Sequence, residues 1–235
     1  MRRRQTISDQ VWSKDVSFNS LKAWRADAAV VILRRVWAAY DNLGADVLNK
    51  VNWDAAEDEL ERSLTFYHSV KIQELQTGDE PFILIPETPE FETRKPAPAR
   101  SAAYDFGFVM RGGDWSMIWP IEAKVLRTDR KLSGYLRDLD DKYLKCKGAP
   151  FSHEGALIGY LISGSPIVVF DGIAAHIGQL LFSPHEFAGR NHRTSTHKRE
   201  VPHGKPYSKD FLCHHLVMEV RESLRNQQSL TLATR

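Results

Sequence analysis

Cysteine is scarce in this 235-residue chain, which contains only Cys146 and Cys213 and no CxxC pair. We therefore expect neither a disulfide framework nor a thiolate zinc site, and a reducing cytoplasm is the expected compartment. Long apolar runs are lacking too, since none reaches the roughly 18 residues needed to cross a bilayer. The basic start, Met1 to Arg4, is followed by polar residues and does not resemble a secretory signal. No membrane partner is expected.

Several familiar catalytic motifs are also missing. The chain has no GxSxG elbow, P-loop or GxGxxG motif, which leaves little support for a small α/β hydrolase. The net charge of +2 is too small to identify a nucleic-acid-binding protein. Basic residues gather in 1–25 and 190–209 with acidic residues between them, as suits a protein that holds a polyanion and keeps metal-binding carboxylates. Solvated ends without a partner would give the same pattern.

The periodicity of apolar residues predicts one domain with a small appendage. Helices are expected over residues 20–49 (broken by a turn at Asn42-Leu43-Gly44), 55–76, 134–145 and 166–181. Strands are expected over 82–85, 103–110, 115–126, 156–162 and 212–220, and loops over 87–100 and 183–210. We divide the chain into an N-terminal helical extension (1–50), a main domain (51–225) and a flexible tail (226–235). The fold class is α/β (α+β), with a mixed central β-sheet flanked by helices.

Three charged residues lie among apolar strand residues around a Gly112-Gly113-Asp114 turn. Strand alternation places Glu122 and Lys124 on one face, and Asp105 lies on the preceding strand of the same hairpin. Two carboxylates so close are costly to bury without a cation, and Mg²⁺ or Mn²⁺ accepts such oxygen ligands, including the carbonyl of Ala123. Lys124 could orient or deprotonate a water, or stabilise transition-state charge. The alternative is an ion pair on a solvated edge strand.

Asp105 followed by Glu122-Ala123-Lys124 resembles the D…ExK part of the PD-(D/E)xK motif of restriction-endonuclease-like nucleases. The resemblance covers about residues 55–163 and implies a core of helix, three-stranded meander, helix and strand. Tyr104 stands where the family's proline would be. Glu61 with Leu64-Thr65 is similar to the family's E-x-x-[IL]-T, which implies a fourth catalytic and metal-binding residue, with Glu57 as second choice. An acidic first turn that only complements the helix dipole is the alternative.

Basic residues elsewhere suggest contacts to nucleic acid. Lys142, on the helix after Lys124, could contact phosphate or lie on a solvated face. In the histidine-rich segment 183–210 we expect Arg193, His197 and Arg199 to belong to a phosphate-binding loop, with a plain solvated loop as the alternative. The histidines match no zinc-site spacing.

These observations predict a Mg²⁺-dependent (or Mn²⁺-dependent) endonuclease that cleaves nucleic acid, DNA rather than RNA. The resemblance implies a role in restriction or phage defence, with a partner defence protein or a homodimer. The alternative is a catalytically silent nuclease-fold module that binds nucleic acid or a protein.

Overall fold

The computed structural model describes residues 28–90, 103–111 and 117–220. Three helices precede the first strand in this part of the chain: α2 (Ala28–Asp41), α3 (Ala45–Leu48) and α4 (Glu57–Glu74). The predicted turn at Asn42-Leu43-Gly44 is confirmed, because it separates α2 from α3. The beginning of the predicted first helix lies outside the described residues.

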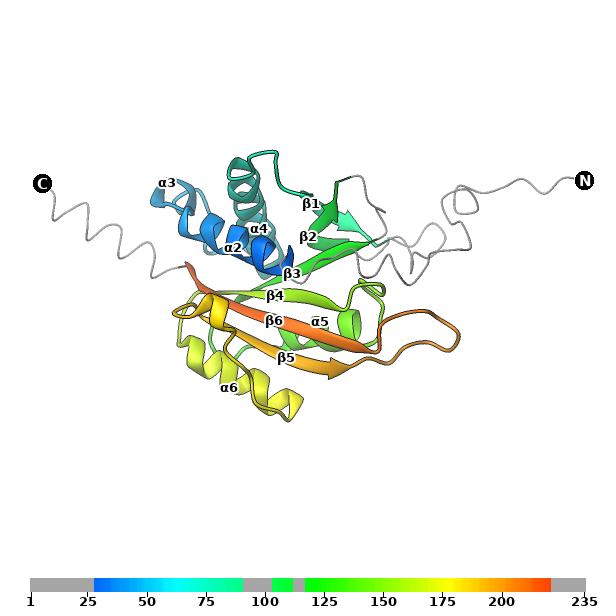
Figure 1. Cartoon of the computed structure of the whole chain (residues 1–235). Coiled ribbons are helices and arrows are strands. Elements are labelled where there is room, and N and C mark those ends of the chain that lie inside the picture. Colours follow the sequence, from blue (N-terminus) through cyan, green and yellow to red (C-terminus); the bar gives the residue numbers. More distant parts are fainter. Residues whose placement is uncertain (1–27, 91–102, 112–116, 221–235) are drawn as a thin grey trace, which may run out of the picture.

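A six-stranded mixed sheet forms the centre of the molecule (Figure 1). Its strands are β1 (Phe82–Pro89), β2 (Ala103–Met110), β3 (Ile118–Leu126), β4 (Glu154–Leu161), β5 (His192–Lys198) and β6 (Asp210–Glu219). They lie in the order β1-β2-β3-β4-β6-β5. The β1-β2-β3 and β6-β5 pairs are antiparallel, whereas β3-β4 and β4-β6 are parallel. The predicted mixed sheet is confirmed, and its Gly112-Gly113-Asp114 turn falls outside the described residues.

Helices cover both faces of this sheet, as predicted. Figure 1 shows α2 and α4 on one side and α5 (Ser133–Asp138) and α6 (Pro166–Ile177) on the other. Helix α5 continues directly into a π-helix, η2 (Leu139–Leu144), and a 3₁₀ turn, η3 (His185–Phe187), precedes β5. Helix α6 is capped on both sides: the hydroxyl of Ser165, just before it, accepts the Ile167 N–H, and Gly178, just after it, has a left-handed φ of 65°.

The predicted N-terminal extension shares its core with the sheet over its described part. Ile32 and Val36 of α2 are fully buried in the same apolar cluster as Leu60 of α4 and Ile121 of β3. None of the described helices is long and apolar enough to span a bilayer.

Two predicted loops, 87–100 and 183–210, were wrong in part, and residues 91–100 of the first lie outside the described residues. Residues 87–89 belong to β1, because main-chain pairing continues to Thr88↔Tyr104 and Pro89↔Ala103. Residues 192–198 form β5, although His-Arg-Thr-Ser-Thr-His-Lys contains no apolar residue and therefore shows no hydrophobic alternation. Its buried members are polar side chains that hydrogen-bond to one another, as described below.

Candidate active site

The two strands that carry the predicted motif separate at its position. The β2–β3 ladder ends at the Phe106–Ile121 pair, just before Glu122. Beyond this point side chains replace the partner strand: Asp105 Oδ2 accepts the main-chain N–H of Ala123 at 2.7 Å. The carboxylate of Glu61 on α4 likewise accepts a main-chain hydrogen bond from Val125. Two of the predicted carboxylates are therefore anchored to the free edge of β3.

Glu122 and Lys124 leave β3 towards the α5–η2 side, whereas Ala123 is buried in the core under α2 and α4. This agrees with the predicted alternation. The Lys124 Nζ lies 2.7 Å from Glu61 Oε1 and 3.3 Å from Asp138 Oδ2. The alternative of an ion pair on a solvated edge strand does not describe this contact, since only 18% of the Lys124 side chain and 20% of the Glu61 side chain are exposed.

Lys142 also belongs to this group. Its Nζ lies 2.6 Å from Glu122 Oε2 and 3.3 Å from Asp138 Oδ2. The alternative of a solvated helix face was therefore wrong for Lys142, because its ammonium group is directed at β3. Asp138 directly precedes the π-helix and Lys142 lies within it, and π-helical turns occur often at functional sites. The sequence prediction assigned no role to Asp138. Its only sequence signal was the four-residue spacing to Lys142.

We call these six residues the carboxylate–lysine cluster: Glu61, Asp105, Glu122, Lys124, Asp138 and Lys142. When all six groups are ionised, the four carboxylates outnumber the two ammonium groups, and the cluster has a net charge of −2. Glu122 is 1% exposed, and its Oε1 is buried with no hydrogen-bond partner among the described residues. A buried carboxylate oxygen in this state is costly unless a cation or a proton reaches it.

The titration of the cluster reflects this imbalance. Burial raises the pKa of Glu122 to about 8; the charge of Lys142 opposes this shift and that of Asp105 adds to it. Burial also raises the pKa of Asp105 and of Glu61. For Lys124, burial favours the neutral form, but Glu61 and Asp138 outweigh it and raise the pKa. Lys124 is consequently protonated at neutral pH.

The oxygen atoms of this cluster suit a hard divalent cation. Asp105 and Glu122 are close enough to affect each other's pKa, and Oε1 of Glu122 has no hydrogen-bond partner among the described residues. Glu61 is less available as a direct metal ligand, because its Oε1 accepts a hydrogen bond from Lys124. Within residues 28–90, 103–111 and 117–220, no three acidic, histidine or cysteine side chains are gathered as a ready metal site. Any ion would therefore complete its coordination with main-chain oxygen, such as that of Ala123, or with water.

The second-choice residue, Glu57, lies one turn before Glu61. Its carboxylate pairs with Lys131, and both side chains are largely exposed. Glu57 is therefore a surface residue at the start of α4.

The predicted phosphate-binding residues of β5 do not join this cluster. Strand β5 lies at the far edge of the sheet, three strand spacings from β3, or roughly 14 Å. Arg193 donates to the carbonyl of His192 at 2.8 Å, and its guanidinium lies 5.1 Å from the centre of the Phe170 ring. His197 is buried, with Nε2 at 2.6 Å from Ser195 Oγ.

Arg199 is buried as well, at 6% exposure. Its guanidinium donates to main-chain carbonyl groups in two segments, Tyr143 on η2 and residues 148–152 of the following loop. These bonds fasten the loop to the end of η2. They leave the guanidinium turned inward, so we correct the prediction that Arg199 lies in a phosphate-binding loop.

The remaining histidines of β5 and β6 form two buried chains of hydrogen bonds, which we call the histidine cluster. In one chain, His215 lies between Tyr135 (3.0 Å) and Ser195 (2.7 Å), and Ser195 continues to His197. The other chain runs through Trp37, His192, His214 and Glu154. Burial lowers the pKa of His215 to about 3 and that of His192 to about 2. Both rings are therefore neutral.

No protein-family model, no curated protein and no solved structure matches this chain. The function of the site must be inferred from its own geometry.

Proposed function

We propose that this chain is a metal-dependent nuclease of restriction-endonuclease-like fold that hydrolyses phosphodiester bonds of nucleic acid. The observation that carries the proposal is the charge of the carboxylate–lysine cluster. When all four carboxylates are ionised, the two unbalanced negative charges correspond to one divalent cation, which would replace the proton of Glu122 and satisfy its Oε1.

Asp105 and Glu122 would hold Mg²⁺ or Mn²⁺, together with the carbonyl of Ala123 and, through water, Glu61. A bound divalent ion supplies a polarised water and neutralises charge on the phosphoryl group. Lys142 can keep Oε2 of Glu122 while Oε1 serves as ligand, because the two oxygens have different surroundings. The ion and the lysine therefore do not compete for one atom.

Lys124 would act as a cation and hydrogen-bond donor. Its raised pKa argues against a role as the base that deprotonates water, the other role considered from the sequence. Instead, its ammonium group can orient a water or stabilise the negative charge that develops on the phosphoryl oxygens. Glu61 and Asp138, which hold Nζ at 2.7 and 3.3 Å, would position it.

A catalytically silent module that binds nucleic acid or a protein is the second candidate. It is favoured by the lysines already present on Glu61 and Glu122, which stabilise the cluster without an ion. The biology that we propose follows the sequence resemblance: cleavage of DNA in restriction or phage defence, with a partner defence protein or a second copy of the chain.

The decisive experiment incubates the full chain with plasmid, linear duplex, single-stranded DNA and RNA in Mg²⁺, Mn²⁺ or EDTA. Lys124→Ala is the test variant, and Lys71→Ala is the matched control, since Lys71 also pairs with a glutamate on the surface of α4, Glu74. We expect cutting that requires metal, persists in Lys71→Ala and is lost in Lys124→Ala. Equal cutting by both variants would refute the site.

If nothing is cut, calorimetric titration with Mn²⁺ separates the two candidates. Binding of Mn²⁺ that Glu122→Gln abolishes would indicate a nuclease that needs a partner. No binding by either protein would favour the silent module.

A further inference from the structure

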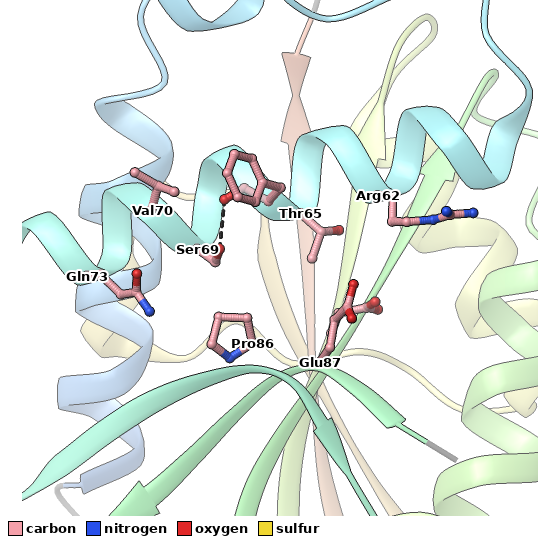
Figure 2. Close-up of a pocket in the computed structure, with 9 residues that line it drawn as sticks. Arg62, Thr65, Ser69, Val70, Gln73, Pro86 and Glu87 are labelled. Atoms are coloured by element: carbon pink, nitrogen blue, oxygen red, sulfur yellow. Dashed lines mark hydrogen bonds between the residues drawn. The ribbon is translucent and has the colours of Figure 1, made fainter. Parts of the chain in front are cut away.

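A hollow between α4 and β1 adjoins the carboxylate–lysine cluster. It has a volume of about 250 Å³ and shares Asp105 with the cluster. Helix α4 contributes Arg62, Thr65 and Phe66 to its wall, and β1 contributes Pro86 and Glu87. Figure 2 shows α4 lying over Pro86 and Glu87, with Thr65 directed towards β1. A second hollow of about 350 Å³ shares Arg62, Phe66 and Glu87 with the first.

The aromatic ring at this site is unusually exposed. Phe66 is 61% exposed on a helix that buries Leu60, Leu64 and Ile72. It borders both hollows and contacts only the edge of Tyr67 among the described rings. An exposed aromatic face beside a hollow is the arrangement on which nucleobases stack.

Several polar groups in the wall of the hollow are bonded within the protein. Ser69 donates to the carbonyl of Phe66 at 2.7 Å, and Asp105 accepts the main-chain N–H of Ala123. The Thr65 hydroxyl is buried beside that of Tyr160, which bonds to His68 at 2.8 Å. A ligand would therefore find its hydrogen-bonding partner elsewhere in the hollow.

Glu87 in the wall of the hollow offers such a partner. Its backbone is left-handed, with a φ of 49°, which is uncommon for a residue with a side chain and occurs often at binding sites. It lies between the Pro86↔Phe106 and Thr88↔Tyr104 pairs of β1 and β2, and it lines the hollow together with Asp105. The carboxylate can accept hydrogen bonds from the amino or imino groups of a base.

The charges of the hollow determine which part of a nucleotide fits. Glu87 and Asp105 in the wall disfavour a phosphate inside. Arg62 is exposed and makes no ion pair with a described residue, and Figure 2 shows its side chain extending away from Pro86. The hollow is also slightly smaller than the roughly 300–1,000 Å³ typical of sites for drug-sized ligands. A single base inside, with a phosphate at Arg62, satisfies all three conditions.

We propose that the hollow between α4 and β1 binds one unstacked base of the substrate strand, next to the phosphate that Asp105 and its neighbours would receive. Phe66 stacks on the base, Glu87 bonds its edge, and Arg62 holds an adjacent phosphate. This inference rests on the proposed function for its placement beside a scissile phosphate. It identifies the substrate class as single-stranded or locally unpaired nucleic acid.

The test measures binding without cleavage, by fluorescence anisotropy of labelled single strands and duplexes of DNA and RNA with the full chain in EDTA. Phe66→Ala is compared with Phe182→Ala, because Phe182 is 65% exposed and lies beside β5, away from the hollow. We expect single strands to bind more tightly than duplexes. Phe66→Ala should weaken their binding about tenfold, as expected for one stacked base, while Phe182→Ala changes it less than about twofold.

An abasic scan makes the test specific. Moving a single abasic position along the strand should locate one place where the missing base weakens binding about tenfold. In Phe66→Ala the same lesion should have no further effect, because the base and the ring form one contact. DNA and RNA strands that respond alike would assign recognition to the base rather than the sugar.

The outcomes separate this inference from the nuclease proposal. Equal affinity of Phe66→Ala and Phe182→Ala for single strands, or tighter binding of duplex than of single strands, would overturn the base pocket. A side chain of a partner protein would then be the candidate occupant of the hollow. Failure to bind any strand would overturn it as well. Binding that depends on Phe66 without metal-dependent cutting would support the pocket and refute the nuclease.

Discussion

The histidine cluster and the carboxylate–lysine cluster both bury polar side chains away from water, but they differ in how far those side chains find partners. In the histidine cluster, imidazole rings and hydroxyl groups hydrogen-bond to one another along β5 and β6. In the carboxylate–lysine cluster, charge is left unbalanced and Oε1 of Glu122 has no hydrogen-bond partner among the described residues. A satisfied network adds to stability, whereas an unsatisfied one reduces it and provides a binding site. The second cluster is therefore the better candidate for function.

Removing one charge from the carboxylate–lysine cluster should have the largest effect. We expect Glu122→Gln to reduce metal-dependent cleavage by a factor of about 10³, because an amide is a poor replacement for an anionic metal ligand. The readout is the initial rate of substrate cleavage in Mg²⁺. Glu74→Gln, on the exposed end of α4, is the matched control and should retain full activity.

Glu122→Gln should not be less stable than the parent protein at alkaline pH. The pKa of Glu122 is about 8 in the folded protein, above its ordinary value of 4.5, so the folded state binds more protons in this range. Ionisation of Glu122 therefore lowers the free energy of unfolding progressively as pH rises from 4.5 to 8, and the full loss remains above pH 8. Urea unfolding at pH 8.5 should show Glu122→Gln to be more stable than the parent by about 1–3 kcal/mol, with less difference at pH 5. A clear loss of stability at pH 8.5 would show that the carboxylate is structural.

Arg199→Lys should destabilise the fold by about 2–4 kcal/mol. A lysine cannot reproduce the planar set of donors that reaches the carbonyls of Tyr143 and the 148–152 loop, and those carbonyls would lose their partners. Chemical denaturation measures the loss. If stability is unchanged but affinity for single strands falls, the original prediction of a phosphate contact would be restored. Lys198→Arg, on the exposed neighbour, controls for the substitution.

Acid should weaken the protein through its buried histidines. Burial lowers the pKa of His68 to about 4, and those of His192 and His215 still further. The unfolded chain then binds more protons than the folded one as pH falls from 6.5 towards 4, so stability decreases over that window and is unaffected above it. Thermal unfolding at pH 7.5, 6 and 5 should show a progressive fall. A flat profile would mean that these rings can be protonated without unfolding.

Strand alternation in the sequence could predict only the part of the carboxylate–lysine cluster that lies on β2 and β3. Asp105, Glu122 and Lys124 lie on two neighbouring strands with clear alternation, so their convergence could be read from local pattern and register. The roles of Asp138 and Lys142 depend on a π-helical turn and on how that turn packs against β3, which no local pattern specifies.

The histidine cluster was hidden for the opposite reason. Its edge strand has buried polar residues in place of apolar ones, so hydrophobic periodicity indicated a loop for residues 192–198. Buried Arg199 shows the same limit: its charge suggested a phosphate contact, but its partners are carbonyls distant in sequence.

The smallest effect that we predict is the loss of one hydroxyl from the histidine cluster. Ser195→Ala removes the group that lies 2.6 Å from His197 Nε2 and 2.7 Å from His215 Nε2. Both ring nitrogens would remain buried without a partner, which should cost about 1–2 kcal/mol of unfolding free energy. Ser163→Ala removes a serine hydroxyl that bonds the carbonyl of Arg127 on the exposed surface, and it should cost less than half as much. Cleavage by both variants, measured below their unfolding temperatures, should equal that of the parent. A loss of cleavage confined to Ser195→Ala would show that the two clusters are coupled through the sheet.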